Sequence, residues 1–258
     1  MLTGCQQLFE LHRIPDPPPS DGACVLASGH DEDNDCITDD VDNCPGIANA
    51  AQLDTDGDHV GNECDPDPTI VGSRLLAFVP FDDASESARW TAIGAWGVGS
   101  DDYTNSDMTA TTEDWAYRTP DTFGLMNELE ARITVGALDA DNEVKIGVGF
   151  YATGATAAEW SCSISRMAGG DAKADAYANT SPSYSSALSP AKLFGQDATY
   201  TLRMRFNAAG VACDIAGDAG DRAQATAPIA TAVVPGYLAV FTTAAAARVH
   251  YLAVYSAM

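Results

Sequence analysis

The sequence predicts an all-β protein, with an antiparallel two-sheet sandwich over residues 71–258 behind an irregular acidic segment. From about Gly72 onward, apolar and polar residues alternate at the two-residue period of half-buried strands, and Gly, Ser, Thr and Asp turns separate the runs. No long segment has the 3.6-residue period of an amphipathic helix. About ten such runs are enough to form two sheets packed face to face.

Three of these runs have the clearest alternation, with their apolar residues on one face. Their apolar positions are Leu129, Ala131, Ile133 and Val135; Val144, Ile146, Val148 and Phe150; and Tyr200, Leu202, Met204 and Phe206. Further predicted strands cover residues 75–81, 95–99, 160–167, 211–216, 236–243 and 249–255. A sheet pair of this size can bury a full core, so the sandwich should fold without help from other segments.

The charge of the chain limits the classes of partner it can bind. The formal net charge is −24, from 37 acidic and 13 basic residues. Such a balance argues against nucleic acid, which needs Lys and Arg to displace counterions, and against adhesion to an anionic membrane through surface charge. Cations, cationic surfaces and neutral ligands such as sugars remain.

The acid is concentrated in residues 31–67, and no Lys or Arg occurs between Arg13 and Arg74. Without a bound positive charge, such a segment repels itself and should stay extended. In a calcium-binding loop of EF-hand type, ligands occupy positions 1, 3, 5, 7 (through a backbone carbonyl), 9 and 12. Two loops match this spacing: Asp31, Asp33, Asp35, Ile37, Asp39 and Asp42, then Asp54, Asp56, Asp58, Val60, Asn62 and Asp65. The segment is therefore predicted to bind about two Ca²⁺ ions, the alternative being a solvated acidic linker.

Both loops depart from the usual pattern at position 6, where Gly normally makes the sharp turn. Cys36 occupies this position in the first loop and His59 in the second. We expect both residues to have positive φ, at a cost of roughly a kcal/mol each. Because Asn62 also replaces a charged ligand with a neutral amide, the affinity should be of the weak, extracellular grade.

Residues 31–65 resemble the thrombospondin type 3 repeat. The match includes Asp-Asn-Cys-Pro at residues 42–45, then Asn49, Gln52 and the closing Cys64-Asp65. The resemblance implies a calcium-binding repeat over residues 24–70, an irregular chain with little hydrophobic core, pinned by disulfides. It also implies that Cys44 pairs with Cys64, which leaves Cys24 to pair with Cys36.

The N-terminal residues 1–23 carry a different signal. Leu2, Thr3 and Gly4 precede Cys5 in a pattern that resembles the bacterial lipobox, in which the cysteine is lipidated, and a Pro-rich spacer follows at residues 13–23. The charged and apolar regions of a signal peptide are missing upstream, and the alternative is a chance match. We expect an exported protein of the cell envelope, anchored in the bacterial outer membrane only through lipid on Cys5.

The cysteine count agrees with export. The seven cysteines are Cys5, Cys24, Cys36, Cys44, Cys64, Cys162 and Cys213. Lipid on Cys5 would leave six for three disulfides, which form in oxidising compartments. Cys162 and Cys213 lie in strand-like runs and could cross-link neighbouring strands or remain buried free thiols.

The region after the repeat is similar in strand pattern to concanavalin-like and laminin-G-like jelly rolls, with a Trp-rich start, "ARWTAIGAW". The resemblance implies a lectin-like jelly-roll sandwich. The aromatic residues that could stack on sugar rings, or simply fill the core, are Trp90, Trp96, Trp115, Trp160, Tyr103 and Tyr117. The residues of a ligand site are not predicted.

Catalytic patterns are scarce in the sandwich. Glu128 and Glu130 share one face of a predicted strand that we expect to see solvent, and the Glu-x-Asp-x-x-Glu arrangement of laminarinase-type enzymes is missing. His250 is the only sandwich histidine, and no phosphate loop, zinc motif or dinucleotide fingerprint occurs. The favoured interpretation is a non-catalytic, calcium-binding surface lipoprotein that presents a lectin-like sandwich to a glycan or protein. A glycan hydrolase and a purely structural envelope module are the alternatives.

Overall fold

The computed structural model describes residues 29–109, 112–123, 127–152, 159–167, 170, 172–178, 181–187, 194–207, 210–228 and 236–256. Cys5, Cys24 and the Pro-rich spacer therefore lie outside the described residues. The strands are β1 (Arg74–Val79), β2 (Trp90–Ala92), β3 (Trp96–Val98), β4 (Tyr103–Asn105), β5 (Asp114–Phe123), β6 (Asn127–Leu138), β7 (Val144–Ala152), β8 (Glu159–Arg166), β9 (Ala172–Ala178), β10 (Ser181–Ala187), β11 (Thr199–Asn207), β12 (Gly210–Gly217), β13 (Arg222–Pro228), β14 (Gly236–Thr243) and β15 (Ala245–Ser256). A short 3₁₀ helix, η1 (Ala84–Arg89), precedes β2.

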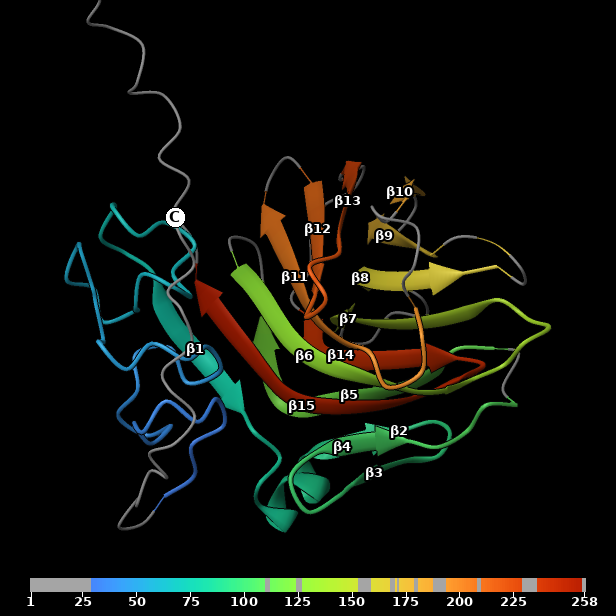
Figure 1. Ribbon diagram of the computed structural model, residues 1–258, viewed down its shortest axis with the longest axis horizontal. Coiled ribbons are helices and arrows are strands. Elements are labelled where there is room, and N and C mark those ends of the chain that lie inside the picture. The colour runs from blue at the N-terminus through green and yellow to red at the C-terminus, as the bar shows by residue number, and fades with distance from the viewer. Residues whose placement is uncertain are drawn as a thin grey trace, which may run out of the picture.

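The strands form two antiparallel sheets packed face to face (Figure 1). The first sheet has the order β13-β12-β11-β6-β15-β4-β3, and β1 also pairs with β15. The second sheet has the order β10-β9-β8-β7-β14-β5-β2. The long strand β15 pairs with β6 along one edge, and with β4 and β1 at successive positions along the other. The predicted two-sheet sandwich is confirmed.

The core lies between the sheets and is built from alternate residues of each strand. All twelve apolar positions of the three clearest runs, now β6, β7 and β11, are buried in it. Strands β9 and β13 present alanines instead: Ala172, Ala174, Ala176 and Ala178 from β9, and Ala223, Ala225 and Ala227 from β13. These two strands lie opposite each other at one end of the sandwich, where small side chains let the sheets approach closely.

A disulfide joins Cys162 of β8 to Cys213 of β12. Because β8 belongs to the second sheet and β12 to the first, the bond crosses the core. It does not cross-link neighbouring strands of one sheet, which was one of the two alternatives left open by the sequence. Both sulfurs are fully enclosed by the core cluster.

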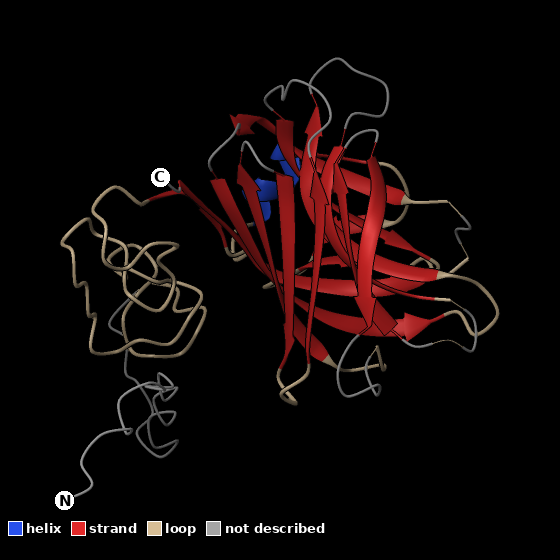
Figure 2. Ribbon diagram, turned by 90° about the horizontal axis from the view of Figure 1, so that it is seen from above, coloured by secondary structure: helices blue, strands red, loops and turns tan. Residues whose placement is uncertain are grey.

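The acidic segment is irregular, as predicted, but it is not separate from the sandwich. It runs as a series of turns and bends beside β1 and β15 (Figures 1 and 2). Cys44, Val60 and Cys64 form a buried cluster with Tyr251 and Tyr255 on the outer face of β15. The segment therefore has little core of its own, and it uses the outer face of the first sheet instead.

The expectation that Glu128 and Glu130 face solvent was wrong. Each is only 1% exposed. They do lie on the outer face of β6, but Arg203, Arg205 and Tyr251 on the neighbouring strands cover them. The alternating pattern located the face correctly, whereas the covering residues come from distant parts of the chain.

Candidate functional site

The two acidic loops have the same internal hydrogen-bond pattern. In each, the carboxylate at position 1 accepts the N–H of position 6: Cys36 donates to Asp31, and His59 donates to Asp54, both at 3.0 Å. The next positions match as well, with Asp33 accepting from the Asp35 N–H, Asp35 from Ile37, Asp56 from Asp58, and Asp58 from Val60, at 2.9–3.2 Å. Two segments 23 residues apart in the sequence, 31–42 and 54–65, thus fold as equivalent loops.

Each loop gathers carboxylate oxygens around one point. The side chains at positions 1, 3 and 5 each offer an oxygen within 4.8 Å of the others, in the groups Asp31, Asp33, Asp35 and Asp54, Asp56, Asp58. Positions 3 and 12 each hold a buried Oδ2 that accepts no hydrogen bond from a described residue, on Asp33, Asp42, Asp56 and Asp65. Buried carboxylate oxygens left without partners are costly unless a cation binds them. The donor set of hard oxygens therefore fits Ca²⁺.

The ionisation of these carboxylates reflects the same crowding. Burial, together with the charges of Asp35 and Asp42, raises the pKa of Asp33 to about 8. Burial also raises the pKa of Asp42. In the second loop, desolvation and then the charge of Asp58 raise the pKa of Asp56. A bound divalent cation would attract the ionised carboxylates and so lower these raised pKa values.

The other predicted ligand positions behave differently. The side chain at position 9 accepts the N–H of position 2 in both loops: Asp39 from Glu32 at 3.0 Å, and Asn62 from Thr55 at 2.9 Å. These side chains are thus engaged in closing the loop, and position 9 of such loops often binds its ion through water. At position 6, φ is +81° for Cys36 and +78° for His59, as the sequence predicts.

Residues of the motif that resembles the thrombospondin type 3 repeat form hydrogen bonds with the first acidic loop. Gln52 donates to the position-12 carboxylate of Asp42 at 2.7 Å, and the Asn49 N–H donates to Asp35 at 2.7 Å. The structure contains the Cys44–Cys64 disulfide. Cys36 is also disulfide-bonded, while Cys24, its predicted partner, lies outside the described residues.

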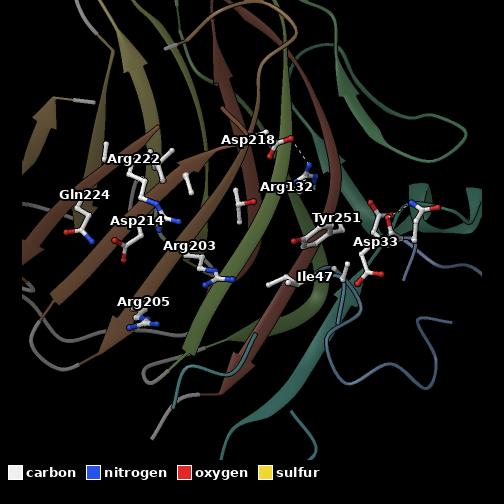
Figure 3. Close-up of a pocket in the computed structure, with 18 residues that line it drawn as sticks. Asp33, Ile47, Arg132, Arg203, Arg205, Asp214, Asp218, Arg222, Gln224 and Tyr251 are labelled. Atoms are coloured by element: carbon white, nitrogen blue, oxygen red, sulfur yellow. Dashed lines mark hydrogen bonds and ion pairs between the residues drawn. The ribbon is translucent and has the colours of Figure 1, made fainter. Parts of the chain in front are cut away.

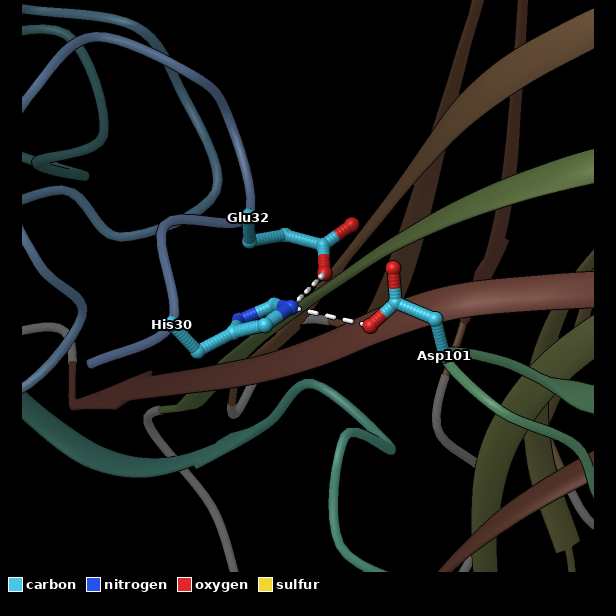
Figure 4. Close-up of side chains that lie close together, drawn as sticks. All are labelled: His30, Glu32 and Asp101. Atoms are coloured by element: carbon cyan, nitrogen blue, oxygen red, sulfur yellow. Dashed lines mark hydrogen bonds and ion pairs between the residues drawn. The ribbon is translucent and has the colours of Figure 1, made fainter. Parts of the chain in front are cut away.

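His30 joins the first loop to the sandwich (Figure 4). Its Nδ1 lies 2.7 Å from Asp39, and its Nε2 lies 2.9 Å from Asp101, in the turn between β3 and β4. Burial alone would lower the pKa of His30, but the hydrogen bonds and charges of Asp39 and Asp101 raise it to about 9. His30 is therefore protonated at neutral pH and bridges two carboxylates. The sequence held no signal for this contact, because Asp101 is 71 residues away.

A groove of about 1270 Å³ runs between the acidic segment and the outer face of the first sheet (Figure 3). Strands β6, β11, β12 and β13 form its floor, and the first loop, with residues 46–48, forms its wall. Four of the chain's 13 basic residues line it: Arg132, Arg203, Arg205 and Arg222. Sequence reasoning missed this site, although the Thr-Leu-Arg-Met-Arg alternation of β11 places two of the arginines on one outer face.

Buried carboxylates hold two of these arginines in place. Arg203 Nε donates to Glu130 at 2.5 Å, and Arg205 Nε donates to Glu128 at 2.5 Å. The Tyr251 hydroxyl donates to the second oxygen of Glu130 at 2.6 Å. The guanidinium groups are thereby fixed against the sheet while the side chains remain 34% and 49% exposed.

Replacing Arg203 with Met should destabilise the protein by about 3 kcal/mol, because it leaves the Glu130 carboxylate buried without its cation. Urea unfolding checks this. The matched control, Arg222→Met, removes an exposed arginine of the same groove that has no ion pair with a described residue, and should change stability by less than about 0.5 kcal/mol. Equal effects of the two substitutions would contradict the assignment of the buried pair.

The aromatic residues divide between the core and the second sheet. Trp90 and Trp96 both contact Tyr103 at one end of the core, and Trp160 packs on Phe206 inside it. Trp115 and Tyr117 of β5 instead lie on the outer face of the second sheet. There they contact Tyr151, and Trp115 also stacks on Phe241. Only Trp115 and Tyr117 of the six predicted stacking residues therefore lie on an outer face.

No protein-family model matches the chain, and no curated protein matches it. Among solved structures, the chain is similar to a protein of unknown function with a galectin-like fold from Bacillus subtilis, at a TM-score of 0.51 and 10% identity, covering 72% of this chain and 100% of that one. The fold is a lectin-like jelly-roll sandwich. The exoplasmic/lumenal domain of VIP36, in its Ca²⁺-bound form, has a TM-score of 0.50 and 11% identity over 72% of this chain and 90% of that one.

A third similar structure is the GH43 protein BlXynB from Bacillus licheniformis, in a mutant form. Its TM-score is 0.48 at 13% identity, and the match covers 70% of this chain but only 39% of that one. At these identities the likenesses show the fold alone, and this third one carries no argument about catalysis.

The described disulfides are typical of proteins that fold outside the cytoplasm. Among the described residues, no helix has the length and apolar character needed to cross a bilayer.

Proposed function

We propose that the protein is a calcium-binding, non-catalytic carbohydrate-binding protein of the cell exterior. The calcium assignment depends on one observation: positions 3 and 12 of both loops each hold a buried carboxylate oxygen that accepts no hydrogen bond from a described residue. A solvated acidic linker has no reason to bury the same two positions twice. About two ions per chain are proposed, one for each loop.

Carbohydrate binding is supported by the lectin-like fold. One structure of similar fold is described as galectin-like, and another is a Ca²⁺-bound form. The calcium loops lie against the outer face of the first sheet, so the two activities would share one region of the molecule.

The non-catalytic assignment is supported by the burial and the arginine ion pairs of Glu128 and Glu130. These carboxylates were the sequence's candidates for glycoside hydrolysis, which requires two carboxyl groups that reach the scissile bond. Each instead receives an arginine hydrogen bond and is buried beneath that side chain. They are therefore poor candidates for a general acid and a nucleophile.

We retain three finer assignments as part of the proposal. Residues 24–70 would be a thrombospondin type 3 repeat, with Cys24 paired to Cys36, and residues 71–258 the glycan-binding sandwich. Residues 1–23 would be a tether attached through lipid on Cys5 to the bacterial outer membrane. Cys5 and Cys24 lie outside the described residues, so these parts rest on the sequence pattern.

The calcium proposal is tested with one isosteric substitution in each loop. Asp33→Asn and Asp56→Asn each remove a charge from the position-3 oxygens, and each should lower the calcium stoichiometry from about two ions to about one. Isothermal titration measures the stoichiometry. The control, Asp82→Asn, alters an exposed acid outside both loops and should leave it unchanged. Full stoichiometry in both loop variants would overturn the ligand assignment.

A further inference from the structure

We propose that the groove between the acidic segment and the first sheet binds a neutral oligosaccharide. This inference rests on the proposed carbohydrate-binding function, and it names the site and the ligand chemistry. The groove's floor is formed by residues of β6, β11, β12 and β13, and its wall is formed by the first acidic loop and residues 46–48 (Figure 3).

The floor places hydrogen-bond donors beside acceptors. In one row across the three strands, Arg203 is the register partner of Asp214, and Asp214 is the partner of Gln224. Arginine offers only donors, an ionised carboxylate only acceptors, and an amide both. A sugar hydroxyl donates and accepts at once, so neighbouring hydroxyls on one ring can satisfy such a row. A ligand with only acceptors could not pair with Asp214, and a ligand with only donors could not pair with Arg203.

Charge also favours a neutral ligand over an anionic one. The four arginines share the groove with Glu32, Asp33, Asp214 and Asp218, and Glu128 and Glu130 lie beneath two of them. Arg132 is already paired with Asp218 at 2.8 Å. The positive charge is therefore balanced locally, while the net charge of −24 repels polyanions at longer range.

The groove is rigid and large enough for several sugar units. The Nε hydrogen bonds of Arg203 and Arg205 to buried carboxylates fix both guanidinium groups before a ligand arrives, which reduces the entropy lost on binding. Its volume of about 1270 Å³ exceeds the roughly 300–1,000 Å³ of pockets for single small molecules. An extended oligosaccharide matches this size better than a monosaccharide.

Affinity gel electrophoresis of the full chain in millimolar calcium tests the proposal. The probes are neutral polysaccharides (a β-glucan, a xylan and a galactomannan) and two anionic ones (alginate and polygalacturonate). The variants are Arg222→Gln and Asp214→Asn, which alter groove residues without an ion pair to a described residue. Arg74→Gln, an exposed arginine outside this groove, is the matched control. Thermal unfolding of each variant confirms that it is folded.

At least one neutral polysaccharide should slow the wild-type protein and Arg74→Gln equally. Arg222→Gln and Asp214→Asn should each weaken that interaction about tenfold, through lost charge-assisted hydrogen bonds. Undiminished binding in both groove variants would leave the carbohydrate-binding function intact but remove its site from the groove. Stronger binding to alginate or polygalacturonate would overturn the ligand chemistry. If no probe slows the wild type while two calcium ions still bind, the carbohydrate function itself fails.

Discussion

Removing calcium should make residues 29–72 sensitive to protease while the sandwich stays folded. The loops bury carboxylate oxygens that have no partners among the described residues, and Asp33 ionises only with a pKa of about 8 when no metal neutralises it. Under the proposed calcium binding, we expect ion binding to supply much of the folding free energy of this segment. Each site saturated at a hundred times its dissociation constant contributes about 2.7 kcal/mol, and chelation removes it.

Glutamyl endopeptidase is suited to this measurement, because it needs no metal and can cut after Glu32 and Glu63 within the segment. Trypsin cannot report on the segment, since no Lys or Arg occurs between Arg13 and Arg74. Cleavage should be fast in EGTA and slow in millimolar calcium. Magnesium is the control, and it should protect poorly because it demands a smaller, regular octahedral site. Equal cleavage rates with and without calcium would refute the metal-dependent fold.

Replacing both Cys162 and Cys213 with Ala should destabilise the sandwich by about 4 kcal/mol. The bond closes a separation of 51 residues, and the loss follows from the added entropy of the unfolded chain. For a domain of this size, the melting temperature should fall by roughly 8–16 °C. Urea unfolding, followed through tryptophan fluorescence, measures the change, because all four tryptophans lie in the sandwich.

The matched control removes the other described disulfide. Cys44 and Cys64 are separated by 20 residues, so the corresponding loss is about 3 kcal/mol and should fall on the acidic segment. The fluorescence transition of the sandwich should then stay near its wild-type midpoint. If the two double variants shift that transition equally, the disulfide across the sheets has no special role in holding them together.

The parts of the structure that the sequence predicted are those fixed by local spacing. Alternation located β6, β7 and β11, because their large apolar residues appear at every second position. The equivalent turns of the two acidic loops were also predictable, since the spacing of their side chains is local, whereas calcium binding by them stays a prediction. Strands β9 and β13 were missed because alanine, which fills their inner face, is a weak strand former elsewhere.

What the sequence could not show depends on pairing between distant strands. The burial of Glu130 requires Arg203 and Tyr251 to lie beside it, and the register of three strands decides that. The groove also depends on contacts between distant segments, because its wall comes from residues 32–48 and its floor from residues 132–251. Tyr251 and Tyr255 alternate as solvent-facing residues would, and only the docked acidic segment accounts for their burial.

The position of β15 determines the order in which the molecule can be assembled. This strand, the last one described, separates β6 from β1 and β4 in the first sheet and supplies Tyr251 and Tyr255 beneath the acidic segment. Neither β1 nor the segment before it has its final partner until residues 245–256 have been synthesised. Contacts between such distant parts of a chain form slowly. The acidic segment must therefore wait, charged and undocked, until residues 245–256 are available before it can reach its final position.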